Sequence, residues 1–510
     1  MKQFLCLLLL VGCAPPQDFT PLEAEAELSG AEGTNLRVEY LTPGTGFTGP
    51  TALPPPTGQP SQPGYSHPAI ARWNVVPHQD FTGTLHVGVL AFHSEDIERV
   101  SFSVEGGAWK SISQVSVNPQ SRTEEYWVAL KAADFPDRRI EVRAIAHPRV
   151  GIPRLLPSLY LNANARGGLP RAIKYVSPQG NDTTGNGTSS NPFRSISRAA
   201  KAIEAEHRSL HPDFDAGGGT IYLLPGSHTL GMGSWNDEVR TQNRWLTIAR
   251  LPSSLISRVK LVDNPNSMPL GIPKVRFLTL TTELIRPTTI FRTKNPGVEQ
   301  IWLDGMRFIG RGPFTDLTWV DPAYQAQYVT ETSVESAMDG FKHAALQRNV
   351  TAKDIGGHPF TGTDLLVNCT IDTLNGPSDP DHHPDVYQFY GPESSHENTI
   401  IYGLKTRGII HAQGIFAGNG IAITNVAIVK SQVNNQVTNE AGRAFLFMGP
   451  TKNLVVKDSE FTGPAAWEAS FTASHVVLQN TRFYSYPQAQ YCRLPPDLSG
   501  VISGVTYRCP

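Results

Sequence analysis

Seven strand-like segments of this chain share one restriction: the fifth residue of each is Gly, Asn or Asp. These residue types tolerate a left-handed backbone at a tight bend, so we expect a bend at the same place in every segment. The segments start at Ile301, Ala345, Asp364, Thr399, Ile421, Leu454 and Val476, and their fifth residues are Gly305, Asn349, Asn368, Gly403, Asn425, Asp458 and Asn480. Successive starts are 44, 19, 35, 22, 33 and 22 residues apart. We interpret the first interval as two coils, and 35 and 33 as single coils with added loops, which predicts a solenoid of stacked coils.

A second stretch indicates where the solenoid begins. This stretch starts at Lys174 with the sequence KYVSPQGNDTTGNGTSSNPFRSISRAAKAI and later continues with GGGTIYLLPGSHTL. Helical spacing of apolar residues is found at Phe193, Ile196, Ala199, Ala200 and Ile203. The stretch resembles the opening of secreted right-handed β-helix proteins of the pectin-lyase-like class, in which a strand and a Gly/Asn-rich turn lead into a short amphipathic capping helix. The resemblance implies an all-β fold with a right-handed parallel β-helix over residues 172–490.

The rest of the chain divides by composition. Residues 14–68 are rich in Pro, Gly and Thr and predict a tether, since they offer little apolar surface to bury. Residues 69–166 contain short alternating strands separated by turn residues, and they resemble a small immunoglobulin-like or fibronectin-like β-sandwich. Residues 491–510 form a C-terminal tail.

The five cysteines have different expected roles. Residues 1–13 resemble a bacterial lipoprotein signal peptide whose lipobox ends at Cys13, which implies cleavage before Cys13, loss of Cys6 with the signal and lipidation of Cys13. The expected location is therefore the bacterial cell envelope, with the outer membrane or cell surface favoured. Cys369 lies in an apolar run and predicts a buried thiol. Cys492 and Cys509 remain in the tail and predict a disulfide.

Charge restricts the partners. The net charge is -2 and the pI about 6.7, which gives no electrostatic footprint for nucleic acid. An acidic polysaccharide would need a local basic patch instead. We expect a monomer whose partner is such a polysaccharide and whose only membrane contact is its lipid.

A further strand ladder is predicted from VYQFYG, QGIFAG, AFLFMG and EASFTA. Aligning their phenylalanines places Phe389, Phe416, Phe447 and Phe471 on successive coils, facing inward. Strand alternation then turns Gln388, Gln413 and Glu468 outward. One coil step brings His411 and Gln413 beside Asp385–Gln388, and Arg443 follows one coil further on.

The segment HPDVYQF, followed by HAQGIF, resembles a pattern found in some bacterial extracellular β-helix proteins tied to polysaccharides. We expect an acidic-polysaccharide site here, with uronan lysis by β-elimination as the favoured reaction. The expected catalytic residues are His383, Asp385, His411, Lys405 and Arg407, and the expected substrate-binding residues are Tyr387, Gln388, Gln413 and Arg443. Arg407, Lys405, Arg443 or a bound Ca²⁺ would neutralise the uronate carboxylate, and His411 or Lys405 would be the base. His383 or Tyr387 would be the acid, and Asp385 would orient a histidine or hold a cation.

Other functions stay open on the same residues. The main alternative is a glycan-binding surface lipoprotein or adhesin without catalysis, and others are a C5-epimerase and a glycoside hydrolase. Hydrolysis usually uses two opposed carboxylates, and Asp385 has no evident carboxylate partner nearby in sequence. Asp379, Asp381, His382 and His383 lack regular ligand spacing, so no metal site is assigned; no cofactor is certain and Ca²⁺ is possible.

Overall fold

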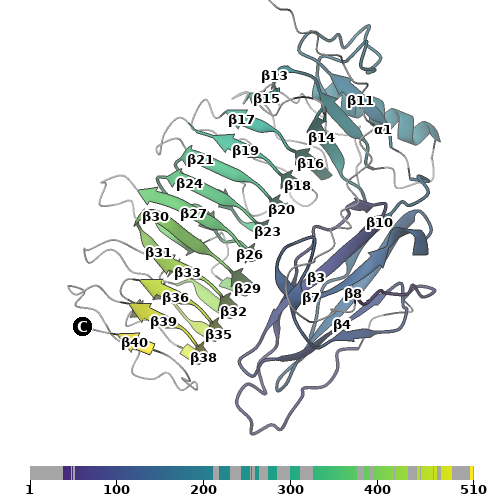
Figure 1. Cartoon of the computed structure of the whole chain (residues 1–510). Helices are drawn as coiled ribbons and strands as arrows, with labels where there is room; N and C mark the ends of the chain where they lie inside the picture. The colour runs from purple at the N-terminus through teal and green to yellow at the C-terminus, as the bar shows by residue number, and fades with distance from the viewer. Residues whose placement is uncertain are drawn as a thin grey trace, which may run out of the picture. The chain divides into compact units, whose positions relative to one another are not determined.

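The computed structural model contains two β modules that follow one another along the chain (Figure 1). The residues it describes are 38–47, 49, 52–169, 171–210, 217–229, 243–252, 254, 259–262, 274–283, 299–310, 325–375, 384–390, 395–418, 420–434, 445–447, 449–462, 465–467, 473–484 and 506–508. The predicted all-β architecture, a β-sandwich followed by a parallel β-helix, is confirmed.

The first module is a sandwich of two sheets that are antiparallel except where β2 pairs with β10 in parallel. One sheet has the order β1-β3-β7-β6, with β1 Ile70–Trp73, β3 Thr84–Phe92, β7 Glu124–Lys131 and β6 Ser116–Val117. The other has the order β2-β10-β8-β4-β5 with β9 on β8, and its strands are β2 Asp80–Phe81, β10 Leu159–Ala163, β8 Arg138–Pro148, β4 Ile97–Val104, β5 Lys110–Ile112 and β9 Arg154–Leu155. A short 3₁₀ helix, Ala132–Asp134, follows β7. Apolar residues at alternate positions fill the space between the sheets.

The predicted tether is wrong over its described part. Leu41 is only 1% exposed and belongs to the core of the sandwich. Its neighbours pair with β7, because the Leu41 amide donates to Ala129 O and the Ala129 amide donates to Glu39 O. Further on, Thr57 pairs with Gly151. The proline-rich composition predicted a tether, but a few apolar residues are enough for this segment to pack against the sandwich.

The second module begins with β11 and a capping helix. The helix α1, Ile196–Leu210, is amphipathic as predicted, and Ile196, Ala199, Ala200 and Ile203 are buried on its inner face. Phe193 is buried just before the helix starts. Within the described part of the chain, no helix has the length and apolar content needed to cross a membrane.

Three parallel sheets form the β-helix; among the described residues the first and second have twelve strands each, and the third has six, from the later coils. The first parallel sheet contains β11 Ile173–Val176, β12 Thr220–Leu223, β14 Leu246–Arg250, β16 Lys274–Leu278, β18 Glu299–Asp304, β20 Gln325–Thr330, β23 Ala344–Arg348, β26 Leu365–Val367, β29 Ser395–Tyr402, β32 Ala422–Val429, β35 Thr451–Lys457 and β38 Ala473–Gln479. The second contains β13 Gly226–Thr229, β15 Val259–Val262, β17 Thr281–Glu283, β19 Arg307–Ile309, β21 Ser333–Ala337, β24 Thr351–Ile355, β27 Thr370–Asn375, β30 Lys405–His411, β33 Gln432–Asn434, β36 Glu460–Thr462, β39 Arg482–Tyr484 and β40 Thr506–Arg508. The third contains β22 Phe341–Lys342, β25 Phe360–Thr361, β28 Asp385–Phe389, β31 Gln413–Ala417, β34 Phe445–Phe447 and β37 Ala465–Trp467.

A single left-handed residue makes the bend between the first and second sheets. The register of the first sheet aligns Thr279, Gly305, Glu331, Asn349, Asn368, Gly403, Lys430, Asp458 and Asn480, and every one has φ between 49° and 66°. Six of the seven predicted bend residues lie in this row. The interval of 44 residues is two coils, because Glu331 lies between Gly305 and Asn349.

The seventh predicted residue, Asn425, belongs to a different row. Lys430 makes the bend of that coil, while Asn425 aligns with Asn398, Asn453 and His475 inside the first sheet, all with positive φ. The physical reason is that strands β29, β32, β35 and β38 contain a second left-handed kink, so one coil offers two positions for Asn. The bend of this coil was therefore predicted five residues too early, at Asn425 instead of Lys430.

The coil interior is apolar and continuous from α1 to β39. Cys369 is fully buried there, and burial raises the pKa of its thiol to about 12, which confirms the predicted buried thiol. The predicted C-terminal tail contributes a strand, because β40 pairs with β39. The remaining predicted cysteines, Cys13, Cys492 and Cys509, lie outside the described residues.

The sandwich packs on the outer face of the first parallel sheet. Apolar side chains buried in this contact are Ile70, Val76 and Leu90 of the sandwich and Trp245, Trp302, Tyr328, Leu346, Leu365, Val367, Ile400, Tyr402, Ala427, Val429 and Val455 of the β-helix.

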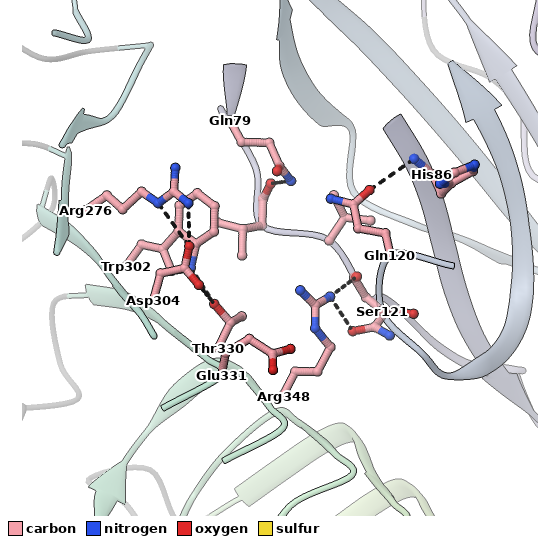
Figure 2. A pocket seen from close by; sticks show the side chains of 13 residues that line it. Gln79, His86, Gln120, Ser121, Arg276, Trp302, Asp304, Thr330, Glu331 and Arg348 are labelled. Carbon is pink, nitrogen blue, oxygen red and sulfur yellow. Dashed lines mark hydrogen bonds and ion pairs between the residues drawn. The ribbon is translucent and has the colours of Figure 1, made fainter. Parts of the chain in front are cut away.

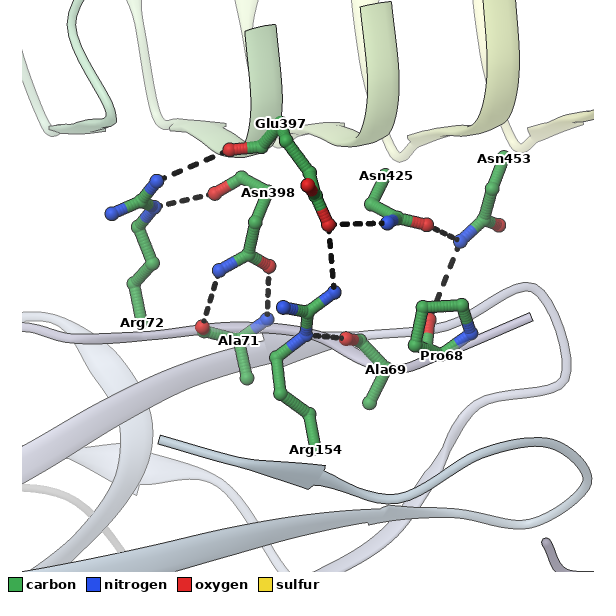
Figure 3. A network of polar contacts seen from close by, with 9 residues as sticks. All are labelled: Pro68, Ala69, Ala71, Arg72, Arg154, Glu397, Asn398, Asn425 and Asn453. Carbon is green, nitrogen blue, oxygen red and sulfur yellow. Dashed lines mark hydrogen bonds and ion pairs between the residues drawn. The ribbon is translucent and has the colours of Figure 1, made fainter. Parts of the chain in front are cut away.

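Polar contacts fix the register of this interface (Figure 3). The Asn398 carboxamide mimics a neighbouring strand, since its Oδ1 accepts from the Ala71 amide at 3.1 Å and its Nδ2 donates to Ala71 O at 3.0 Å. Arg72 pairs with Asp364 at 3.0 Å. Asn453 donates to Asn425 at 2.7 Å and to Pro68 O at 3.3 Å. The kinked asparagine row therefore binds the sandwich.

Candidate functional site

The second and third parallel sheets meet at a corner that collects polar side chains. Strand pairing aligns Phe341 with Phe360, Thr361 with Gln388, and Asp385 with Gln413. Counting back along each strand places Asp339, His358, Asp385 and Gln413 on four successive coils. We call these four residues the corner row. Acidic, basic and amide side chains from different coils are therefore stacked in one row along the corner.

His358 and Asp385 form the centre of the corner row. His358 Nδ1 lies 3.3 Å from Asp385 Oδ2 and 3.2 Å from the backbone N of Asp385. The Asp385 side chain is fully buried, whereas the His358 side chain is 16% exposed. When Nδ1 lacks a proton, it accepts from the Asp385 amide, and when it carries one, it donates to the carboxylate. Both contacts are made by Asp385, so a residue of the next coil holds one side of the imidazole ring in place, as a proton-transfer group needs.

A buried ion pair supports the same corner. Lys342 Nζ lies 2.7 Å from Asp339 Oδ2, with each side chain 10% exposed. The other carboxylate oxygen of Asp339 accepts from the His358 amide at 2.7 Å. Asp339 therefore connects the lysine to the backbone that carries His358, and it limits how His358 can move.

Gln413 extends the corner row to the next coil. It is half-buried and lies opposite Asp385 in the strand register, as predicted. Its Oε1 is buried and has no hydrogen-bond partner among the described residues. It shares its strand face with Ile415 and Ala417, so the prediction that Gln413 points outward is wrong.

The register also corrects the predicted phenylalanine stack. Phe389 aligns with Ala417 and Phe447, so Phe416 lies on the opposite face and is half-exposed. Because Ala417 is small, the Phe389 and Phe447 rings reach one another, with centroids 6.0 Å apart. A register slip of one residue exchanges the two faces of a strand, which is the error made at Phe416. Phe471 and Glu468 lie outside the described residues.

Tyr387 is not available to a substrate. It is fully buried in the coil interior, and its hydroxyl donates to Thr363 O at 2.7 Å. Burial raises the pKa of the phenol far above its ordinary value. The prediction that Tyr387 binds substrate or donates a proton is therefore wrong. Gln388, on the other strand face, is half-exposed.

The predicted bases and cations lie on the second sheet. Lys405, Arg407 and His411 are all exposed on β30, where they align with Thr370, Asp372 and Asn375. His411 is two residues before Gln413 and so lies at the corner. Lys405 is eight residues before Gln413, about 25 Å along an extended strand. The predicted residues thus do not share one trough, because Lys405 and Arg407 lie away from Asp385.

Two predicted site residues cannot be placed. His383 and Arg443 lie outside the described residues, as do Asp379, Asp381 and His382. In the part of the chain that is described, no group of three or more His, Cys, Asp or Glu side chains is arranged to hold a metal ion.

Sequence reasoning missed His358, Lys342 and Asp339. They adjoin strands of two residues each, β22 and β25, which carry no visible alternation. The available signal was the spacing to the next coil, because Phe341 and Phe360 are 19 residues apart, like the bends at Asn349 and Asn368. The role predicted for Asp385, orienting a histidine, matches the geometry, but the histidine is His358.

No protein-family model and no curated protein matches the chain. Among solved structures, the chain is similar to a rhamnogalacturonan lyase, with 9% identity over 66% of this chain and 87% of that chain, at a TM-score of 0.29. It is also similar to the A-module of the mannuronan C-5 epimerase AlgE4 of Azotobacter vinelandii, with 11% identity over 62% and 87% of the two chains and a TM-score of 0.26. A third is Dex49A from Penicillium minioluteum, with 9% identity, 85% and 86% coverage and a TM-score of 0.30. Because these scores are low, the β-helix assignment rests on the strand pairing described above.

Proposed function

We propose that this chain cleaves an acidic polysaccharide by β-elimination at the corner row. The observation that supports the proposal most directly is the contact of His358 Nδ1 with the buried carboxylate of Asp385. With a proton on Nδ1, held by the carboxylate, Nε2 would be the basic nitrogen; this tautomer gives up the hydrogen bond from the Asp385 amide, which Nδ1 accepts otherwise. Among the described residues of the corner, His358 is the histidine that has this support.

The reaction would proceed from a uronate held against the corner. Nε2 of His358 takes the proton from C5, and the electron pair of the C5–H bond forms the C4=C5 double bond. The C4–O bond to the leaving sugar breaks, and the leaving oxygen takes a proton from an acid. His411, exposed two residues before Gln413, is the proposed acid. Asp385 acts through His358 and is a positioning residue.

The substrate would be bound on both sides of the corner. Lys405 and Arg407 are exposed on the second sheet and would hold carboxylates of neighbouring uronate residues. Tyr390, 52% exposed at the end of β28, offers an aromatic face for a sugar ring. The proposed location remains the bacterial cell envelope, with the chain anchored through a lipid on Cys13.

The test is a screen of acidic polysaccharides for the ultraviolet absorbance of the new C4=C5 bond. We expect one uronan to give this signal with the wild-type chain and none with His358→Ala. His343→Ala is the matched control and should leave the signal intact. His343 follows β22, so it lies beyond the C-terminal end of that strand, beside Gly362, whereas the corner row precedes the strands of the third sheet. Asp385→Asn should reduce turnover.

Three results would contradict the proposal. A folded His358→Ala variant with wild-type turnover would exclude His358 as the base. Binding of a uronan without any unsaturated product would identify a glycan-binding protein. A product with an intact ring and inverted C5 would identify an epimerase.

A further inference from the structure

A cavity lies between the sandwich and the first parallel sheet of the β-helix, whereas the corner row lies between the second and third sheets. Its volume is about 190 Å³. Gln79 and Gln120 line it from the sandwich, and Trp302, Asp304 and Arg348 line it from the β-helix (Figure 2). The lining is mostly polar, although both modules bury apolar side chains beside it. A polar cavity in a largely apolar interface indicates a place where polar groups find partners other than protein.

Arg348 is a buried cation on the wall of this cavity. Its Nη1 donates to Asn74 O at 2.9 Å and to Asn74 Oδ1 at 3.2 Å. Its Nε is buried and has no hydrogen-bond partner among the described residues. The other terminal nitrogen points toward the side of the cavity that Asp304 and Thr330 line (Figure 2). One terminal nitrogen of a charged group therefore faces the cavity, a second donor, Nε, is buried beside it without a partner, and burial lowers the pKa of Arg348.

The carboxylates near Arg348 are engaged by other groups. Asp304 pairs with Arg276 and accepts from Thr330 Oγ1 at 2.8 Å. Glu331 pairs with Arg122 at 2.5 Å. Within the described part of the chain, neither carboxylate forms an ion pair with Arg348.

A third acidic residue, Glu125, is also engaged. It is fully buried in the sandwich, and its oxygens accept from Asn74, Asn118 and Ser121 at 2.9, 2.7 and 2.5 Å. Burial raises the pKa of Glu125 to about 7, so near neutral pH it supplies only part of a negative charge. Within the described part of the chain, none of the three carboxylates forms an ion pair with Arg348; they attract its guanidinium from a longer distance, and a buried charge is costly without a counter-ion in direct contact.

We propose that this cavity binds a small carboxylate, of the size of a single uronate residue, through Arg348. A carboxylate matches the fork of Nε and the second terminal nitrogen, which allows two parallel charge-assisted hydrogen bonds. Gln120, exposed at the mouth, would hold the rest of the ligand through its amide nitrogen, since its Oε1 already accepts from the His86 amide. The opposite wall is the indole of Trp302, with the Arg276 guanidinium 4.0 Å from the ring centroid.

This site is distinct from the corner row and does not depend on catalysis there. A bound carboxylate would contact both modules at once, because Arg348 belongs to β23 and Gln120 to the sandwich. It would therefore stabilise the contact between them, and it would bind a chain end or a released monosaccharide rather than the middle of a polymer.

The experiment is calorimetric titration of the full chain carrying His358→Ala, so that turnover does not contribute heat. The probes are glucuronate and galacturonate, with acetate as a minimal carboxylate, inorganic phosphate as another anion and glucose as the neutral control. We expect saturable binding of a uronate, weaker binding of acetate and none of glucose. Arg348→Lys keeps the charge but loses the fork, and it should weaken uronate binding at least about tenfold.

Gln120→Trp is the second variant, because it fills the exposed mouth without touching the Asn74 contact. It should also weaken binding, and its own fold can be checked by the unchanged thermal transition. Equal affinity in wild type and in both variants would overturn the proposal, since the ligand would then bind elsewhere. Absence of saturable binding by every carboxylate probe, or binding of glucose as tight as that of uronate, would also overturn it.

Discussion

Acidification should lower the stability of the folded chain through His93. His93 is 3% exposed in the sandwich. Its Nε2 lies 3.2 Å from His67 O and its Nδ1 accepts from the Glu95 amide at 3.1 Å. Protonation would turn Nδ1 from an acceptor into a donor that faces another donor. Burial, the largest cause, lowers the pKa of His93 from 6.5 to about 4.

The sign and size follow from that pKa. Because the folded state holds the proton less tightly than the unfolded state, the stabilisation is complete above pH 6.5 and is lost as the pH falls toward 4. At 1.36 kcal/mol per pKa unit, the loss from His93 is about 3 kcal/mol. His475 adds to the effect, because its ring stacks on His67 with centroids 4.1 Å apart and burial lowers its pKa to about 4 as well. His475 is only half-buried, so its share is smaller.

The assay is urea unfolding at pH 7, 6, 5 and 4, followed by tryptophan fluorescence. His93→Gln keeps a donor for His67 O but cannot be protonated, so its stability should fall less across this range, by about 3 kcal/mol. Exposed His411→Gln is the control and should follow the wild type. If His93→Gln lost as much stability as the wild type between pH 6.5 and 4, the argument from burial would be refuted.

Two further predictions concern buried charge. Burial raises the pKa of Glu125 from 4.5 to about 7, so its contribution to the unfolding free energy is present below pH 4.5 and is lost as the pH rises through 7. The unfolding free energy of Glu125→Gln should therefore rise by about 3 kcal/mol relative to that of the wild type between pH 4.5 and 8. A pH-independent difference between the two in urea unfolding would contradict this. Asp80 pairs with the Arg244 guanidinium, whose side chain is 2% exposed; Asp80→Asn should lower the unfolding free energy by roughly 3 kcal/mol, and Arg244→Met added to it should restore part of the loss. A fully additive double variant would show that the pair is not coupled.

The bends were predictable where residue type reports the backbone. Gly305, Asn349 and Asn368 belong to types that accept positive φ, and all three adopt it. Glu331 and Lys430 adopt the same conformation on equivalent coils, and nothing in their residue type indicates it. At these two residues the stacking of neighbouring coils imposes the bend, so the residue type of one coil alone does not predict it.

The site was less predictable than the fold, because it depends on register. Asp385 and Gln413 were placed on adjacent coils correctly, since both occur in strands with clear alternation. Tyr387 was misassigned, because a tyrosine in an alternating strand can face inward if a carbonyl such as Thr363 O accepts its hydroxyl. His358 was overlooked because it precedes a strand of only two residues.

The position of the sandwich supports the corner row as the candidate functional site. The sandwich occupies the outer face of the first parallel sheet, which leaves the second and third sheets to a polymeric ligand. The two modules therefore have separable roles: variants of interface residues such as Asn398 should change stability, and variants of His358 should change turnover. A sandwich variant that altered substrate choice without altering stability would be inconsistent with this division.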